Sequence, residues 1–533
     1  MASISYRCNL SAKSFPLLAR NQSRTVIVPG NDQPYTRYGS VSERLRDVNT
    51  PQAYYMENVL PTIEGYLAVG YKTVQATEIL PGPNIVKVKE LYRNGSQYFV
   101  GEANTGSFYN LGSGISWTSP PGLMTGNVCT NYNENAVSYA TVNGVTYVLQ
   151  RDIFSSGTNF SVFSGTDMTN TATSGLTLFN IIGIVGANGY NIAYSKTAVA
   201  WSSLVDPTDF VPSLITGAGG GSIQEAKGYI QFCLPASFGF IVYCERNCVA
   251  AVYTGNSRNP FKFTEIKGSG GGVSPELVAR DVGQQFNIAW TTKGLQRLGP
   301  AVAENIHPEL EALIYTKYKE SLNLASNSFT TSAVSIRLGR LVYLCNRYLC
   351  YSFNAESAST SESGYTDVIV YDSVLERWGR LSFDHAHLGE FHNYVAQGTP
   401  TNYTFTDIAH PIFLISKRGL VYQLGERFGS FSGGESAIIL GKFQYVRAKR
   451  LCLDKVNLEN SGQNFDSTSI TCVDLPTQED ATNETPVSGT VFSSRSTFKV
   501  FHFNVDAIAH SLLIKGGFNL TNVELEFHPT GNT

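Results

Sequence analysis

Short runs of alternating apolar and polar residues, each ended by a turn residue, recur along most of this chain and constrain its fold more than any other feature. In the clearest run, residues 140–150, the pair Asn143-Gly144 separates two alternating segments. Asn-Gly suits the positive φ angles of a type I′ turn, so this run predicts a β-hairpin. The same pattern returns in five further segments: 91–102, 228–253, 286–299, 340–353 and 413–425. A period of two is typical of strands and not of helices.

These units recur with irregular spacing from about Tyr54 onward. Radial repetition of small antiparallel sheets explains such a chain best, because a propeller blade takes about 40–50 residues plus insertions. We therefore predict an all-β fold in which residues 54–434 form a β-propeller of six or seven blades. A β-sandwich, or a serial array of small β-domains, stays open as an alternative.

The two ends and one internal segment differ from the repeats. Residues 1–53 predict an irregular N-terminal arm, and residues 435–533 predict a small C-terminal β-sandwich. The segment 308–322 predicts a helical insertion, because its apolar residues fall on one helical face and Pro308 stands near the first helical position. Such a helix covers a sheet or, in the minority interpretation, docks to a partner.

Charge is sparse and nearly balanced. Only 15% of the 533 residues are charged, with 39 Lys and Arg against 42 Asp and Glu, while Gly reaches 49. This composition excludes a coiled coil, a disordered regulator and a strongly basic nucleic-acid binder. Residues 1–100 hold eleven basic and seven acidic side chains, whereas residues 451–533 hold four and ten. Opposite charge at the two ends favours head-to-tail contacts between subunits.

The cysteines and the apolar segments of the sequence indicate in which cellular compartment the chain is made. The nine Cys form no CxxC pair, the N-terminus lacks a secretory signal, and the most apolar stretch, 176–187, is short and interrupted. We expect reduced thiols, synthesis in the cytosol and no membrane insertion. Cys244 and Cys248, like Cys345 and Cys350, flank expected hairpin turns. Each pair could approach across neighbouring strands, although reduced thiols are the favoured interpretation.

Catalytic motifs are missing from the sequence. The glycine run 217–222 lacks the Lys of a phosphate-binding loop, and the run 268–272 is better interpreted as a loop between blades. Neither a nucleophile elbow nor HExxH occurs, and the aspartate boxes of sialidase-like propellers are absent. The sequence therefore assigns no catalytic, cofactor-binding or metal residue, and we expect a protein that is not an enzyme and needs no cofactor.

Three groups of side chains are candidate binding sites. The histidines His385, His387 and His392 have Asp384 and Glu390 nearby, so a metal site is geometrically possible, although structural histidines are the favoured interpretation.

The basic cluster consists of Arg447, Lys449 and Arg450. It suits a polynucleotide contact or, more simply, a charged edge strand. The tryptophans are expected to anchor blades, with a sugar-stacking platform as the alternative; they are Trp117, Trp201, Trp290 and Trp378.

Several short sequence motifs, in the order in which they occur along the chain, resemble those of the tail nozzle proteins of short-tailed bacteriophages, also described as tail tubular or packaged-DNA-stabilising proteins. The motifs are 200–203 followed by 206–210, Asn259-Pro260-Phe261, the loop 268–275, 288–295, Tyr371-Asp372 with 376–378, and 419–422. The resemblance spans about residues 54–430 and rests on structural motifs.

The resemblance implies a structural virion protein without catalytic residues. It implies a hexameric ring beneath the portal and adaptor rings, in contact with tail fibres or spikes and enclosing the channel for genome retention and ejection. The expected place is the virion tail, after assembly in the cytoplasm of the host bacterium, and genomic DNA would pass without specific binding. Two alternatives stay open: a receptor-binding propeller that recognises host glycan, and a glycan-cleaving propeller, which would need paired carboxylates.

Overall fold

The computed structural model describes the residues that form the strands and most of their turns. They are residues 4–8, 10, 25–28, 53–63, 65–75, 85–93, 96–103, 108–111, 117–118, 137–150, 160–163, 168–171, 173–176, 181–282, 286–308, 310, 318–323, 328–356, 364–390, 412–426, 433–445, 450–460, 466–472, 487–488, 490–494, 498–507 and 509–530.

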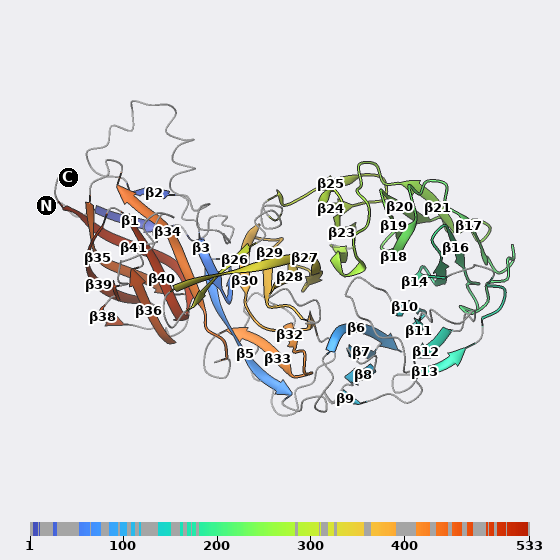
Figure 1. The fold of residues 1–533 in the computed structure, drawn as a ribbon, viewed down its shortest axis with the longest axis horizontal. Helices are drawn as coiled ribbons and strands as arrows, with labels where there is room; N and C mark the ends of the chain where they lie inside the picture. The colour runs from blue at the N-terminus through green and yellow to red at the C-terminus, as the bar shows by residue number, and fades with distance from the viewer. Residues whose placement is uncertain are drawn as a thin grey trace.

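The described part of the chain contains seven four-stranded antiparallel blades, so the prediction of a β-propeller is confirmed. Figure 1 shows the blades in a ring, with a separate group of strands at one end. The first five blades are consecutive along the chain and form separate sheets. Blade 1 is β6 (Ile85–Arg93), β7 (Ser96–Ala103), β8 (Phe108–Leu111) and β9 (Trp117–Thr118), and blade 2 is β10 (Val137–Val142), β11 (Val145–Gln150), β12 (Phe160–Phe163) and β13 (Met168–Thr171). Blade 3 is β14 (Gly183–Ala187), β15 (Tyr190–Tyr194), β16 (Ala198–Trp201) and β17 (Gly219–Ser222), and blade 4 is β18 (Ile230–Ala236), β19 (Gly239–Cys244), β20 (Cys248–Tyr253) and β21 (Phe261–Glu265). Blade 5 is β22 (Val278–Val282), β23 (Phe286–Thr291), β24 (Gly294–Leu298) and β25 (Ala303–Asn305).

The last two blades belong to one larger sheet. Blade 6 is β27 (Ser328–Leu344), β28 (Tyr348–Glu356), β29 (Asp367–Asp372) and β30 (Arg377–Leu381). Blade 7 combines β31 (His387–Glu390), β32 (Ile412–Ile415) and β33 (Val421–Glu426) with β5 (Tyr66–Gln75), which comes from the start of the chain. The ring is therefore closed by hydrogen bonds between an early and a late strand.

Local turn chemistry explains the hairpins within the blades. Asn143 and Gly144 have φ angles of 49° and 77°, so the predicted turn between β10 and β11 is confirmed. Between blades, apolar side chains from adjacent sheets pack into shared cores. One such core joins Trp290 of blade 5 to Tyr351 and Trp378 of blade 6.

The strands after residue 434 form the second part of the molecule, a β-sandwich, as predicted for 435–533. One sheet contains β1 (Ile4–Cys8), β41 (Asn519–Thr530), β35 (Arg450–Asn460), β39 (Phe498–Ala507) and β38 (Thr490–Ser494). The other contains β2 (Thr25–Val28), β3 (Ala53–Glu57), β34 (Ala437–Tyr445), β40 (Ala509–Gly517), β36 (Asp466–Cys472) and β37 (Val487–Ser488). A core of buried aliphatic and phenyl side chains fills the space between the two sheets.

The predicted arm thus gives two strands, β1 and β2, to the sandwich, and β3 begins at its last residue. β1 pairs with β41, while β2 and β3 both pair with β34. Most of residues 1–53 lie outside the described part. The pairings tie the described pieces of the N-terminus to the end of the chain, which the sequence did not predict.

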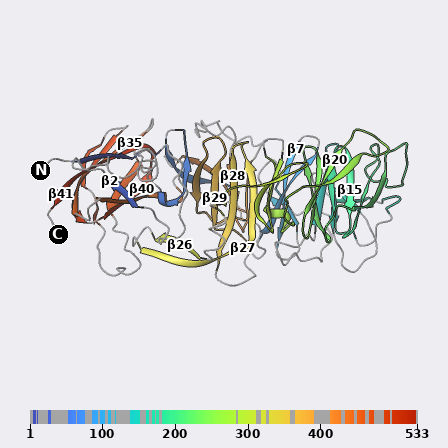
Figure 2. The ribbon, with the colours of Figure 1, turned by 90° about the horizontal axis from the view of Figure 1, so that it is seen from above.

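The prediction of a helix over 308–322 is wrong at its C-terminal end, residues 318–322. Pro308 and Leu310 are helical and residues 311–317 lie outside the described part, but Tyr318–Asn323 form the strand β26. β26 pairs with the first half of β27 in six registered positions, and Figure 2 shows this hairpin standing away from the blades. The apolar spacing that suggested a helix is outweighed by this hydrogen-bonded pairing.

Propeller and sandwich are joined by one sheet. The short strand β4 (Val59–Pro61) pairs with β30 of blade 6 and with β5 of blade 7. β5 in turn pairs with β41 of the sandwich through Tyr66 and Leu67. A hydrogen-bonded path therefore runs from blade 6 to the far edge of the sandwich.

Candidate functional site

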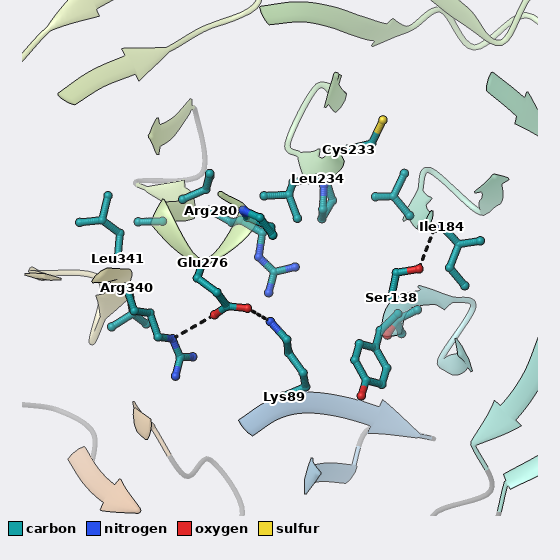
Figure 3. Close-up of a pocket in the computed structure, with 18 of the residues that line it drawn as sticks. Lys89, Ser138, Ile184, Cys233, Leu234, Glu276, Arg280, Arg340 and Leu341 are labelled. Atoms are coloured by element: carbon teal, nitrogen blue, oxygen red, sulfur yellow. Dashed lines mark hydrogen bonds and ion pairs between the residues drawn. The ribbon is translucent and has the colours of Figure 1, made fainter. Parts of the chain in front are cut away.

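The propeller has a cavity along its axis. Its volume is about 480 Å³, and its lining comes from β6, β10, β14, β18, β22 and β27, the strands of six blades that face the axis (Figure 3). Axial cavities formed by convergent strands are common ligand positions in propeller-like and barrel-like folds. This cavity is the main candidate site in the described part of the chain.

A buried carboxylate links three blades inside the cavity. Glu276 stands in the 3-10 turn Pro275–Leu277 that leads into β22, and Ser274 caps this turn by accepting a hydrogen bond from the Glu276 amide. The Glu276 carboxylate accepts a hydrogen bond from Lys89 Nζ of β6 and lies 3.8 Å from Arg340 Nε of β27. The side chain of Glu276 is only 8% exposed, so removing either cation would leave a charge with little solvation.

Positive charge exceeds negative charge in the lining. Among the described residues of the cavity wall, Lys89, Arg280 and Arg340 face the single carboxylate of Glu276. Arg280 lies on β22, is exposed, and forms no ion pair within the described part. Figure 3 shows its guanidinium beside the ion pair of Glu276 and Lys89. The cavity therefore has the electrostatic character of a site for anions.

His387 extends the charged cluster to blade 7. Its Nδ1 contacts Arg340 Nη1, and burial together with the nearby cations Arg340 and Lys89 holds the pKa of His387 well below its usual range. The imidazole is thus neutral at pH 7. Because Arg340 can only donate, Nδ1 accepts this hydrogen bond and the ring proton is on Nε2.

The two described histidines of the group that had a metal site as its alternative interpretation are held by other contacts. His385 is buried, its Nδ1 donates to the Phe383 carbonyl at 2.6 Å, and its Nε2 lies 3.0 Å from Ser352 Oγ. Both ring nitrogens are therefore occupied, and burial lowers the pKa of His385 to about 4. Asp384 is exposed, and His392 lies outside the described residues. These features support the structural interpretation of His385 and His387.

Comparisons with known proteins identify no family. No protein family matches the sequence, and no curated protein matches it. Among solved structures, the extracellular domain of a protein named as a hybrid two-component system from B. thetaiotaomicron is 10% identical with a TM-score of 0.35. That match covers 67% of this chain, which spans 40% of the bacterial domain. The WD40 domain of Neurospora crassa Pan2 is 7% identical with a TM-score of 0.34, over 67% of this chain and 95% of that one.

The two glycine runs have structural roles. Gly219–Ser222 is β17, the last strand of blade 3, so this run is not a phosphate loop. The 268–272 run connects blades 4 and 5, which confirms its interpretation as an inter-blade loop. Gly270 N donates to Gln296 Oε1, and Gly271 packs so closely that a Cβ would lie 1.9 Å from the Glu245 carbonyl oxygen.

The cysteines of both hairpins are free thiols. Cys244, Cys248 and Cys350 are buried and Cys345 is half-buried. Burial raises the pKa of Cys244 to about 12, so this thiol stays protonated at neutral pH. These side chains act as small apolar groups in the blade cores.

Two of the four tryptophans are buried in the blades, as expected of blade anchors. These are Trp290 and Trp378, while Trp201, which is half-buried, donates from Nε1 to the Gly217 carbonyl. Trp117 lies in β9 with its side chain outside the described part. Of the basic cluster, Arg447 and Lys449 are outside the described residues, and Arg450 begins β35. Burial of two tryptophans removes them from any sugar-stacking platform.

Sequence reasoning missed the cavity residues. Lys89, Glu276 and Arg340 lie in strands and turns of three blades, far apart along the chain, and no motif joins them. The one available signal was charge inside otherwise apolar strands, as in the segment Ile85–Arg93.

Proposed function

We propose that this chain is a structural subunit of the tail nozzle of a short-tailed bacteriophage, in line with the resemblance of its sequence motifs to that family. The observation that supports the proposal most is the sheet that runs from blade 6 through β4 and β5 into the sandwich. A subunit that must hold a shape under mechanical load benefits from domains joined by backbone hydrogen bonds and not by a linker. The nozzle would be a homohexameric ring seated on the adaptor ring and contacting tail fibres or spikes.

The surface of blade 3 supplies a contact for such a ring. The loop between β16 and β17 exposes five apolar side chains: Leu204, Val205, Val211, Leu214 and Ile215. Val205 and Ile215 are 87% and 92% exposed. Apolar residues gathered in one exposed loop are typical of protein–protein interfaces. We propose that neighbouring copies cover this loop, and that the genome channel lies between the copies, where DNA passes without specific binding.

The test is the oligomeric state and its symmetry. Light scattering after size-exclusion chromatography, alone and with the adaptor ring, together with electron microscopy of virions, is expected to show six copies around the tail axis. Ile215→Asp is expected to weaken ring formation, whereas Val374→Asp, at another exposed apolar residue on blade 6, is expected to leave it intact. Copies found only at fibre tips would overturn the proposal.

The second candidate is a receptor-binding propeller. Tyr229 favours it, since this ring is 53% exposed and has Lys196 Nζ 5.6 Å from its centroid. An exposed aromatic ring beside a cation is a common sugar contact. Saturable binding of host surface polysaccharide that is lost in Tyr229→Ala would favour this candidate over the nozzle.

A further inference from the structure

Three side chains of metal-binding type meet on the sandwich, far from the propeller cavity. Cys452 and Asp454 come from β35 and His528 comes from β41. One sulfur, one carboxylate oxygen and one ring nitrogen all lie within 4.8 Å of one another. In a four-coordinate zinc site the metal–ligand bonds are about 2.0–2.3 Å, so two ligand atoms of one ion lie at most about 4.6 Å apart, and these three side chains are near enough to share one ion.

The strand register explains how these residues converge. Cys452 lies directly opposite His528 in the antiparallel pair of β35 and β41. Between Leu453 and Lys455 the chain advances two residues on β35 but only one on β41, so Asp454 is the extra residue of a β-bulge in this pairing. A bulge re-aims a side chain, and bulges are frequent beside functional sites. Here the Asp454 Oδ2 atom lies 2.6 Å from His528 Nδ1.

The cluster faces away from the sandwich core. Leu453 and Phe527 point into the core, and successive residues of a strand point to opposite faces. Cys452 and His528 therefore share the outer face. Cys452 is nevertheless only 2% exposed, while His528 is half-buried, so the group lies in a partly desolvated position where metal–ligand bonds are strong.

The electrostatic surroundings favour a cation. Asp506 of β39 stands opposite Cys452 on its other side, so it adds a second carboxylate beside that of Asp454. A divalent cation at this position would neutralise the carboxylates and allow the sulfur to bind as thiolate.

We propose that Cys452, Asp454 and His528 bind a zinc ion. A set of one sulfur, one nitrogen and one oxygen suits zinc or cobalt, whereas magnesium and calcium prefer oxygen ligands alone. The ion would join β35 and β41, and it would stabilise the outer sheet of the sandwich in addition to its hydrogen bonds.

Cobalt titration of the full chain, stripped with a chelator, tests the site. Co²⁺ is expected to bind with a stoichiometry of one and to give a thiolate-to-cobalt charge-transfer band, which excess Zn²⁺ removes. Cys452→Ser is expected to abolish this band, whereas Cys345→Ser, a half-buried thiol on blade 6, is expected to retain it. His528→Gln and Asp454→Asn are expected to weaken cobalt binding by about tenfold or more.

A second measurement keeps the proposal testable where a variant folds poorly. Zn²⁺ is expected to raise the thermal midpoint of the native chain and not that of His528→Gln, because a ligand that binds only the folded state stabilises it. The proposal is overturned if the native chain gives no band with cobalt, or if Cys452→Ser keeps the band. It is also overturned if Cys452 reacts with iodoacetamide faster than Cys345 while zinc has no effect on the thermal midpoint.

Discussion

At the scale of single residues, the cavity on the propeller axis brings one carboxylate together with three cationic side chains. Glu276 is the only carboxylate among the described lining residues, and it compensates cations from two other blades. Its contribution depends on the low exposure of all three partners, because exposed ion pairs are worth little. The same chain offers such an exposed pair, Arg297 with Glu304, in blade 5.

Glu276→Gln is expected to lower the free energy of unfolding by about 1–3 kcal/mol, because it leaves Lys89 and Arg340 without a counter-charge in a partly desolvated cavity. Urea unfolding measures this loss. Glu304→Gln removes the carboxylate of an exposed pair and is expected to cost at most about 0.5 kcal/mol. Equal effects of the two substitutions would contradict the importance of burial.

His385 predicts an acid-dependent loss of stability. Its pKa is about 4 in the folded chain and about 6.5 when unfolded, so the unfolded state binds more protons between these values. Its contribution is therefore complete above about pH 6.5 and decreases as the pH falls toward 4, by about 3 kcal/mol in total.

The measurement for His385 is the free energy of unfolding as a function of pH. His385→Gln is expected to reduce the slope of this curve between pH 6.5 and 4. A native curve that is already flat in this window would count against a neutral, buried His385.

At the scale of elements, local chemistry was predictable and long-range pairing was not. Asn143-Gly144 dictates its own turn, and the hairpin it closes was predicted correctly. Tyr318–Leu322 has apolar spacing that suits either a helix or a strand, and only pairing with β27 decides between them. The cavity and the cysteine–histidine cluster depend on strands distant in sequence, such as Cys452 with His528, and a single sequence carries no signal for such pairs.

Gly271 tests the packing of the loop between blades 4 and 5. A Cβ at this position would lie 1.9 Å from the Glu245 carbonyl oxygen, which is backbone and cannot rotate away. Gly271→Ala is therefore expected to destabilise the chain by about 1–3 kcal/mol in urea unfolding. Gly221→Ala in β17, where a Cβ meets nothing within 4 Å, is expected to be neutral or slightly stabilising.

At the scale of the whole molecule, β5 decides whether propeller and sandwich behave as one body. Its first residues pair with β41 of the sandwich, and its later residues close blade 7. Arg377 of blade 6 adds to the junction by donating to the Thr62 carbonyl in the turn before β5. Two domains that share a strand are expected to unfold together, since the sandwich cannot open at β41 without exposing the edge of β5.

Gly65, in the turn between β4 and β5, is the position at which this coupling can be weakened. A Cβ on Gly65 would lie 1.9 Å from the Leu520 carbonyl oxygen of β41, so Gly65→Ala forces the sandwich and the propeller apart at their shared strand. Calorimetry of the native chain is expected to give one transition, and that of Gly65→Ala two, while Gly221→Ala keeps one. Two transitions in the native chain would mean that the shared sheet does not couple the domains, and the main support for a rigid nozzle subunit would be lost.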